Sequence, residues 1–169
     1  MKTNVTLIGM PGAGKSTIGV VLAKVLGFDF IDTDLVIQKQ TGKRLQEIID
    51  TNGNDGFKKT ENTIVSELNA SSSVIATGGS VCYGNEAMCN LKKQSVVVYI
   101  KLSAGELAKR LGNLSTRGVV MPDGFTLQDL YDERNPLYEK YADVTVETQG
   151  LSIEDSVNSI VKKVLPYIC

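Results

Sequence analysis

Apolar residues recur along this chain in two alternating patterns, and the alternation predicts the fold class. Between five short apolar runs, apolar residues return every three or four positions, as on one face of a helix. Strands that alternate with helices predict a three-layer α/β/α domain with a five-stranded parallel sheet, whose ligand crevice lies at the carboxyl ends of the strands. The five apolar runs are 4–8, 28–31, 73–77, 95–102 and 143–147.

Two segments are longer than such a layout requires. Residues 33–70 hold about three helical segments, with breaks near Gly42 and within 53–56, and predict a helical insertion over the crevice that would bind substrate. Residues 112–124 form a glycine-bounded loop with several apolar members, so we expect a lid that closes over bound ligand. A disordered surface loop is the alternative for this second segment.

Composition and charge narrow the classes of function. The 169 residues, 42% hydrophobic and 22% charged, suit one globular domain with a sizeable core. A net charge of −1 gives no reason to expect nucleic acid or a membrane surface as a partner. No run approaches the roughly 20 apolar residues of a membrane span, and the first apolar run begins without a signal peptide. Nothing indicates a large exposed apolar face, so we expect a monomer that binds small molecules.

Cysteine and histidine usage points to a reducing compartment and to carboxylate chemistry. Cys82, Cys89 and Cys169 are odd in number and match no zinc spacing, so we expect free thiols in the cytoplasm. The chain contains no histidine, which leaves carboxylates as the natural general bases.

The strongest single motif is a phosphate-binding loop at residues 9–16. Gly-Met-Pro-Gly-Ala-Gly-Lys-Ser matches G-x-x-x-x-G-K-[ST] in full, after an apolar run and before a helical stripe. Its glycines let backbone N–H groups converge on phosphate oxygens at a helix N-terminus. We expect Lys15 to reach the β- and γ-phosphates of a nucleoside triphosphate and Ser16 to offer its hydroxyl to Mg²⁺. The residues expected to bind the nucleotide here are Gly12, Ala13, Gly14, Lys15, Ser16 and Thr17.

Two carboxylates follow the second predicted strand, beside the phosphate-binding loop. Phosphoryl transfer needs a divalent cation and a group that orients the attacking hydroxyl. Asp32 suits the metal, directly or through water, and Asp34 suits the hydroxyl. An acidic pair after a strand is also a common helix N-cap, and the pair alone leaves both interpretations open.

Four further motifs occur in a fixed order along the chain: Phe-Lys-Lys-Thr-Glu at 57–61, Thr-Gly-Gly-Ser at 77–80, Arg-Gly-Val-Val at 117–120 and Arg-Asn-Pro-Leu-Tyr at 134–138. Together with the phosphate-binding loop and Asp-x-Asp, they resemble the motifs of the shikimate kinases nearly from end to end. The resemblance implies a P-loop NTPase fold of the nucleoside monophosphate kinase type. It also implies ATP-dependent phosphorylation of the 3-hydroxyl of shikimate, in aromatic amino-acid biosynthesis.

The resemblance implies roles for individual side chains. Asp34 would act as the base that orients the accepting hydroxyl, while Lys15 and Arg117 would stabilise charge on the transferring γ-phosphoryl group. Arg110 would lie beside the adenine. Mg²⁺ would be held by Ser16 and Asp32. The residues that would contact the acceptor are Asp34, Lys58, Gly78, Gly79, Ser80 and Arg134.

Three positions depart from the family pattern. Lys58 replaces an arginine whose planar fork binds a carboxylate through two hydrogen bonds, whereas lysine supplies a point charge. Ser80 adds a side chain where the family has glycine, and Gly118 stands in the lid in place of a proline. All three lie at acceptor or lid positions, so the nucleotide-binding motifs are intact.

Two other functions stay open on this basis. One is a related kinase for another small hydroxy acid or polyol such as gluconate, and the other is an ATP-binding regulatory module without turnover. Lys58 could instead pair with Glu61 on a helix surface, and Arg134 could be a structural clamp. The joint occurrence of the motifs in family order favours the kinase.

Overall fold

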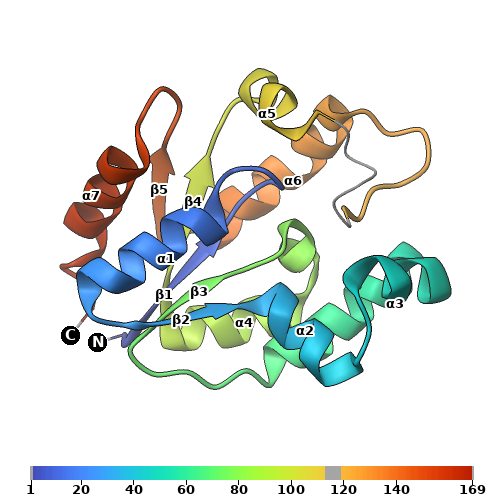
Figure 1. Ribbon diagram of the computed structural model, residues 1–169, viewed down its shortest axis with the longest axis horizontal. Coiled ribbons are helices and arrows are strands. Elements are labelled where there is room, and N and C mark those ends of the chain that lie inside the picture. Colours follow the sequence, from blue (N-terminus) through green and yellow to red (C-terminus); the bar gives the residue numbers. More distant parts are fainter. Residues whose placement is uncertain (1, 113–118, 169) are drawn as a thin grey trace.

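The computed structural model describes residues 2–112 and 119–168, which form a three-layer α/β/α domain (Figure 1). The strands pair in the order β2-β3-β1-β4-β5, and every pairing is parallel. This confirms the predicted fold class, and no strand end differs from its predicted position by more than one residue. The strands are β1 (Asn4–Ile8), β2 (Asp29–Asp32), β3 (Ser73–Ala76), β4 (Ser95–Lys101) and β5 (Val144–Glu147).

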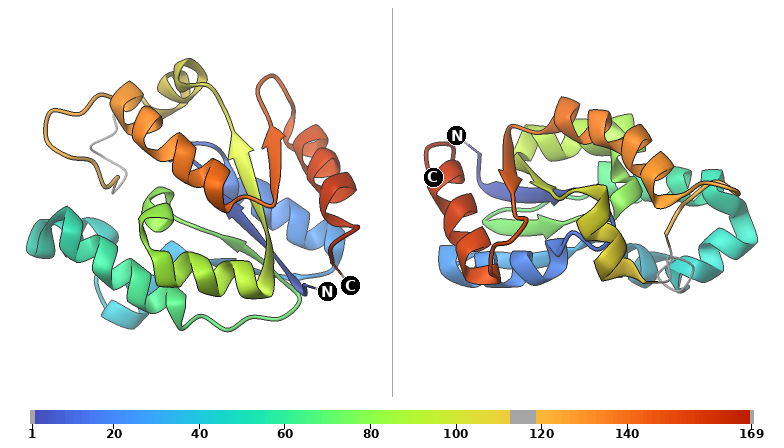
Figure 2. Two further views of the ribbon diagram at one scale, coloured as in Figure 1. Left: turned by 180° about the vertical axis from the view of Figure 1, so that it is seen from behind. Right: turned by 90° about the horizontal axis from the view of Figure 1, so that it is seen from above.

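The helices cover both faces of the sheet (Figure 2). Seen from above, α1 and α7 lie on one face, and α4 and α6 lie on the other. In chain order the helices are α1 (Lys15–Leu26), α2 (Thr33–Thr41), α3 (Leu45–Ser66), the 3-10 helix η1 (Gly79–Tyr83), α4 (Asn85–Gln94), α5 (Ala104–Leu111), α6 (Leu127–Tyr141) and, after the last strand, α7 (Ile153–Val164). Within the described residues, none of these helices has the length and apolar character that crossing a membrane requires.

Burial on both faces explains the composition of β4. All its residues except Lys101 are buried, and the apolar run Val96–Ile100 is at most 1% exposed. A strand covered by helices on both sides has no solvent-facing side chains. Its sequence is therefore a continuous apolar run rather than an alternation of apolar and polar residues.

The segment 33–70 has a small apolar core of its own. α2 ends at Gly42, which adopts the left-handed conformation (φ 68°), and α3 is interrupted at Gly53, which has non-helical angles (φ 71°, ψ 175°). Both breaks lie where the sequence predicted them. The buried residues of this second core are Ile37, Ile48, Phe57, Ile64 and Val120.

Val120 belongs to the segment that we predicted as a lid. It is only 3% exposed and packs against α2 and α3, while Asn54 Nδ2 donates to the carbonyl of the next residue, Met121, at 2.8 Å. The part of the segment that follows residue 118 is therefore attached to the helical segment. Leu114, which we counted among the apolar residues of the lid, lies outside the described residues.

The side chain of Asn4 links the amino ends of the central strands through hydrogen bonds. Its side chain is fully buried: Nδ2 donates to the carbonyls of Ala70 (2.8 Å) and Gln94 (3.2 Å), and Oδ1 accepts from the N–H of Ser73 (3.0 Å). One side chain thus satisfies three backbone groups that precede or begin β3 and β4.

Replacing Asn4 is therefore expected to destabilise the whole domain. Asn4→Ala leaves buried backbone groups unpaired, at a cost of about 1–3 kcal/mol each, so we expect the free energy of unfolding to fall by at least about 2 kcal/mol. Urea denaturation measures this change. Asn52→Ala, on the exposed surface of α3, is the matched control, and equal stability of the two variants would contradict the interpretation.

Candidate active site

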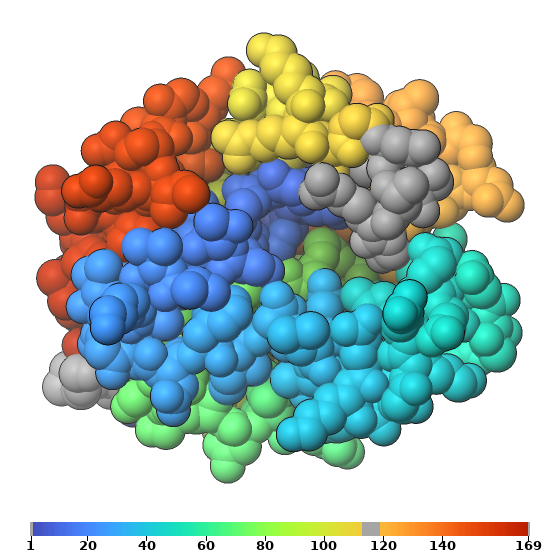
Figure 3. Space-filling model, viewed as in Figure 1, coloured from blue at the N-terminus to red at the C-terminus, as the bar shows by residue number. Residues whose placement is uncertain are grey.

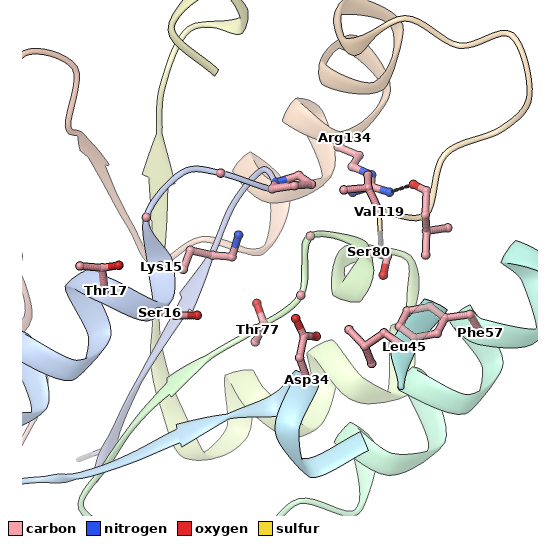
Figure 4. Close-up of a pocket in the computed structure, with 16 residues that line it drawn as sticks. Lys15, Ser16, Thr17, Asp34, Leu45, Phe57, Thr77, Ser80, Val119 and Arg134 are labelled. Atoms are coloured by element: carbon pink, nitrogen blue, oxygen red, sulfur yellow. Dashed lines mark hydrogen bonds between the residues drawn. The ribbon is translucent and has the colours of Figure 1, made fainter. Parts of the chain in front are cut away.

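A cavity of about 250 Å³ opens at the carboxyl ends of β1, β2 and β3. The space-filling view shows this face hollowed between the blue phosphate-binding loop and the cyan α2–α3 segment (Figure 3). The close-up shows side chains from several elements pointing toward this space (Figure 4). The predicted site residues that line the cavity are Gly12, Gly14, Lys15, Ser16, Thr17, Asp34, Gly78, Gly79, Ser80 and Arg134.

The phosphate-binding loop joins β1 to α1 and wraps around the Lys15 side chain. The Lys15 ammonium donates to the carbonyls of Gly9 and Met10, both at 2.8 Å, and the residue is 8% exposed. Burial lowers the Lys15 pKa to about 8, against the opposing effect of the nearby Asp34 carboxyl. Gly12 has φ 78°, and a Cβ there would lie 2.7 Å from Leu111 Cδ2, so the loop requires glycine at this position.

Asp32 caps α2, as one of the two interpretations expects, and it also contacts Ser16, while its role toward a metal stays a prediction. Its Oδ1 accepts from the Asp34 N–H at 3.0 Å, which caps α2, while its Oδ2 accepts from the Ser16 hydroxyl at 2.8 Å. A hydroxyl and a carboxylate side by side are oxygen ligands that suit Mg²⁺. Within the described residues, no group of three acidic, Cys or His side chains could hold a metal by itself.

Asp34 enters the cavity from the first turn of α2, across from the turn that follows β3. Burial, together with the nearby Asp32 charge, raises the Asp34 pKa to about 6 against the opposing effect of Lys15. A Cβ built on Gly78 would lie 2.9 Å from both Asp34 Oδ1 and Glu61 Oε1. Glycine at position 78 thus lets the turn pass between these two carboxyl groups without displacing either.

Ser80 and Glu61 form a buried pair that the sequence did not predict. The Ser80 hydroxyl donates to Glu61 Oε2 at 2.6 Å, and Glu61 is 1% exposed. Glu61 Oε1 has no hydrogen-bond partner within the described residues. Burial raises the Glu61 pKa to about 7; the Ser80 hydrogen bond lowers it and Asp34 raises it. The sequence feature that could have predicted its burial is that Glu61 shares one helical face with the apolar residues Phe57, Ile64 and Val65.

Arg134 is a buried cation without an acidic partner. It is 1% exposed on α6; its Nε donates to the Tyr83 hydroxyl at 3.2 Å, and its Nη2 donates to the Val120 carbonyl. Within the described residues, no carboxylate lies within salt-bridge distance of it. Because an unpaired buried charge is costly, a guanidinium that lines a cavity in this state favours an anionic ligand.

Lys58 does not line the cavity in this structure. Its ammonium lies 4.3 Å from the centroid of the Tyr83 ring and 3.7 Å from Asp55 Oδ1. The helix-surface partner is thus Asp55 rather than Glu61, and this pair is weak because the Asp55 side chain is 93% exposed. Sequence reasoning did not single out Tyr83, which contacts both cations of this region.

Arg110 lies at a second cavity, of about 200 Å³, beside the phosphate-binding loop. Gly14 and Thr17 line both cavities, and Ala13 lines the second, so the two cavities adjoin at the phosphate-binding loop. Arg110 Nε also donates to Glu106 Oε1 at 3.3 Å, one turn earlier on α5. Arg117, expected near the γ-phosphate, lies outside the described residues.

The buried Glu61 is expected to make stability depend on pH. Folding raises the Glu61 pKa from 4.5 to about 7. Such an acid stabilises the fold fully at pH values below its unfolded pKa, and this contribution to the free energy of unfolding is lost as the pH rises through its folded pKa. We therefore expect Glu61→Gln, which cannot ionise, to lose less free energy of unfolding than the wild type between about pH 5 and pH 8.

Urea denaturation at several pH values tests this expectation. Glu67→Gln, at an exposed position beyond α3, is the matched control and should follow the wild type. Parallel pH profiles for the wild type and Glu61→Gln would contradict the assignment.

Comparisons with known proteins agree with this geometry. A family model for shikimate kinase matches residues 11–165. The shikimate kinase of Vibrio cholerae serotype O1 is 36% identical over 170 residues, covering 99% of this chain and 98% of that protein. The shikimate kinase of Francisella tularensis subsp. holarctica is 40% identical over 161 residues, covering 93% of this chain and 92% of that protein.

Solved structures agree as well. The shikimate kinase from Acinetobacter baumannii in complex with shikimate matches with a TM-score of 0.89 and 31% identity, covering 98% of this chain and 94% of that chain. The family match, the full-length relatives and the shared fold lead to one conclusion: this chain belongs to the shikimate kinase family, whose activity uses ATP as co-substrate.

Proposed function

We propose that this protein transfers the γ-phosphoryl group of ATP to the 3-hydroxyl of shikimate, giving shikimate 3-phosphate for aromatic amino-acid biosynthesis. The single observation that carries the proposal is the buried Arg134, which has no acidic partner within the described residues and shares one cavity with Lys15 and Asp34. A small acceptor that carries both a carboxylate and a hydroxyl satisfies the cation and the base at once.

The reaction follows from the roles of the surrounding side chains. The acceptor hydroxyl, oriented by Asp34, attacks the γ-phosphorus and gives its proton to the Asp34 carboxylate. As the new O–P bond forms, the bond from the γ-phosphorus to the β,γ-bridging oxygen breaks, and ADP leaves. Lys15 stabilises the charge on the transferring group, and we propose that Arg117 adds a second cation there.

We propose Mg²⁺ as the metal, held by the Ser16 hydroxyl and, directly or through water, by Asp32. When bound, the ion neutralises phosphate charge. The hydrogen bond between these two side chains keeps both oxygens beside the phosphate-binding loop. We propose that Arg110 lies against the adenine in the second cavity.

The acceptor would lie over the turn at Gly78 and Gly79, with its carboxylate toward Arg134. A Cβ on Gly79 would lie 2.9 Å from Arg134 Nη1, so glycine keeps the path to the guanidinium open. Ser80 lines the same wall, and we propose that Lys58 supplies a second positive charge.

We further propose that 33–70 acts as the substrate-binding segment and 112–124 as the lid of a single-domain enzyme. The attachment of Val120 and Met121 to the helical segment supports this division. We propose that the enzyme works as a cytoplasmic monomer on small molecules, without nucleic acid or membrane; the net charge of −1 supports this.

A coupled assay of ADP release from Mg·ATP, with and without shikimate, tests the function. We expect shikimate-dependent turnover of several per second or more. ADP release that shikimate does not increase would contradict the proposal.

Asp34→Asn tests the base. We expect turnover to fall by roughly 10²–10⁴-fold while ATP affinity stays nearly unchanged, because the amide cannot accept the proton. Asp29→Asn, at the exposed opposite end of β2, is the matched control and should keep wild-type turnover. Near-normal turnover of Asp34→Asn would rule out this role.

Lys58→Ala tests the second cation of the acceptor site. We expect the KM for shikimate to rise roughly tenfold or more, with little change in the KM for ATP, because a charge-assisted contact to the carboxylate is lost. Lys59→Ala removes the same charge from the exposed neighbouring position and should leave both constants unchanged. Equal effects of Lys58→Ala on the two KM values would show that Lys58 does not act on the acceptor.

A further inference from the structure

Tyr83 lies beside the candidate acceptor site but has no part in the mechanism above. It ends η1, directly after the turn formed by Gly78, Gly79 and Ser80, and it is half-buried. Three side chains from two other helices converge on it: Lys58 from α3, and Glu133 and Arg134 from α6.

Two cations meet at the ring of Tyr83. Lys58 Nζ lies 4.3 Å from the ring centroid, and Arg134 Cζ lies 5.2 Å from it. A cation is attracted to the face of an aromatic ring within about 6 Å, and the attraction strengthens where water is excluded. The ring therefore holds two like charges near one another, although these charges repel.

The hydroxyl of Tyr83 has a fixed direction. It donates to Glu133 Oε1, which leaves its oxygen lone pairs to accept from Arg134 Nε at 3.2 Å. Burial, together with the Glu133 hydrogen bond, raises the Tyr83 pKa to about 12, so the hydroxyl keeps its proton at neutral pH. Arg134 thus receives a neutral acceptor that orients the guanidinium without cancelling its charge.

This arrangement suits the binding of an external anion. A carboxylate bonded directly to Arg134 would compete with a ligand, whereas the Tyr83 hydroxyl stands between the guanidinium and the Glu133 carboxylate. The only acidic group within salt-bridge distance of Lys58, among the described residues, is the exposed Asp55 at 3.7 Å. Both cations therefore contact the same neutral side chain, Tyr83.

We propose that Tyr83 is a positioning residue for the carboxylate of the acceptor: its ring holds Lys58, and its hydroxyl holds Arg134. The inference rests on the proposed function. It also gives a physical account of Lys58 at a position where the family carries arginine. Lysine lacks a planar fork that fixes its own geometry, and stacking on Tyr83 restricts the flexible ammonium instead.

The experiment compares shikimate with its methyl ester, which lacks the negative charge, in assays of the wild type, Tyr83→Leu and Tyr83→Phe. In Tyr83→Leu we expect the KM for shikimate to rise by about 5- to 30-fold, with the KM for ATP and that for the ester unchanged. In Tyr83→Phe, which keeps the ring, we expect a smaller rise that is again confined to shikimate. Tyr167→Leu, at an exposed position, is the matched control.

A double-variant cycle separates positioning from simple packing. If Tyr83 acts by holding Lys58, then Lys58→Met should raise the KM for shikimate much less in the Tyr83→Leu background than in the wild type. A rise of equal size in the two backgrounds would overturn the proposal. A rise in KM for shikimate, the ester and ATP alike would also overturn it, because it would indicate a structural role alone.

The inference and the proposed function fail in different ways. Wild-type turnover with shikimate, together with an unchanged KM for shikimate in Tyr83→Leu, overturns the inference and leaves the function standing. Wild-type enzyme without shikimate-dependent turnover overturns both. If Tyr83→Leu does not fold, Tyr83→Phe tests the inference instead. An unchanged KM for shikimate in that variant overturns the role of the hydroxyl in positioning Arg134.

Discussion

Charged groups withdrawn from water at the carboxyl edge of the sheet constrain the rest of this structure. Lys15, Glu61 and Arg134 are each less than 10% exposed, and Asp34 enters the same region. Burial shifts the pKa values of Lys15, Asp34 and Glu61 toward their neutral forms, which measures the cost of removing charge from water. Neighbouring hydrogen bonds offset part of this cost, and the anionic ligand proposed at Arg134 would offset more of it.

The buried charges are also sorted by position. The acidic groups Asp34 and Glu61 flank Gly78, whereas Arg134 lies beyond Gly79 and Lys15 lies in the phosphate-binding loop. An acceptor with an alcohol at one end and an acid at the other has the complementary polarity. In the proposed complex, this order of charges would direct the alcohol toward Asp34 and the acid toward Arg134.

The amino-acid sequence was sufficient to predict the strands and the part of the site that the backbone near the phosphate-binding loop forms. Apolar runs located the strands, and the phosphate-binding loop and the two aspartates depend on local order along the chain, which a motif captures. The contacts of Lys58, Ser80 and Tyr83 were not predictable in the same way, because each joins two elements that are distant in sequence. Helical spacing places Lys58 on a face of α3, but only the packing of η1 and α6 brings the Tyr83 ring under its ammonium.

The positions of the turn after β3 differ in the room that they leave for a side chain. A side chain at Gly78 would collide with two carboxyl oxygens at 2.9 Å, and one at Gly79 would meet Pro11 at 2.8 Å and Arg134 at 2.9 Å. Position 80 instead accommodates a hydroxymethyl group, which finds its own partner in Glu61. A side chain at 78 would have to displace two carboxyl groups and one at 79 would press on the Pro11 ring, whereas position 80 carries a side chain, and the departure from the family pattern falls there. A hydroxyl on the wall of the pocket can therefore be added at position 80 while the neighbouring glycines leave the backbone of the turn without side chains.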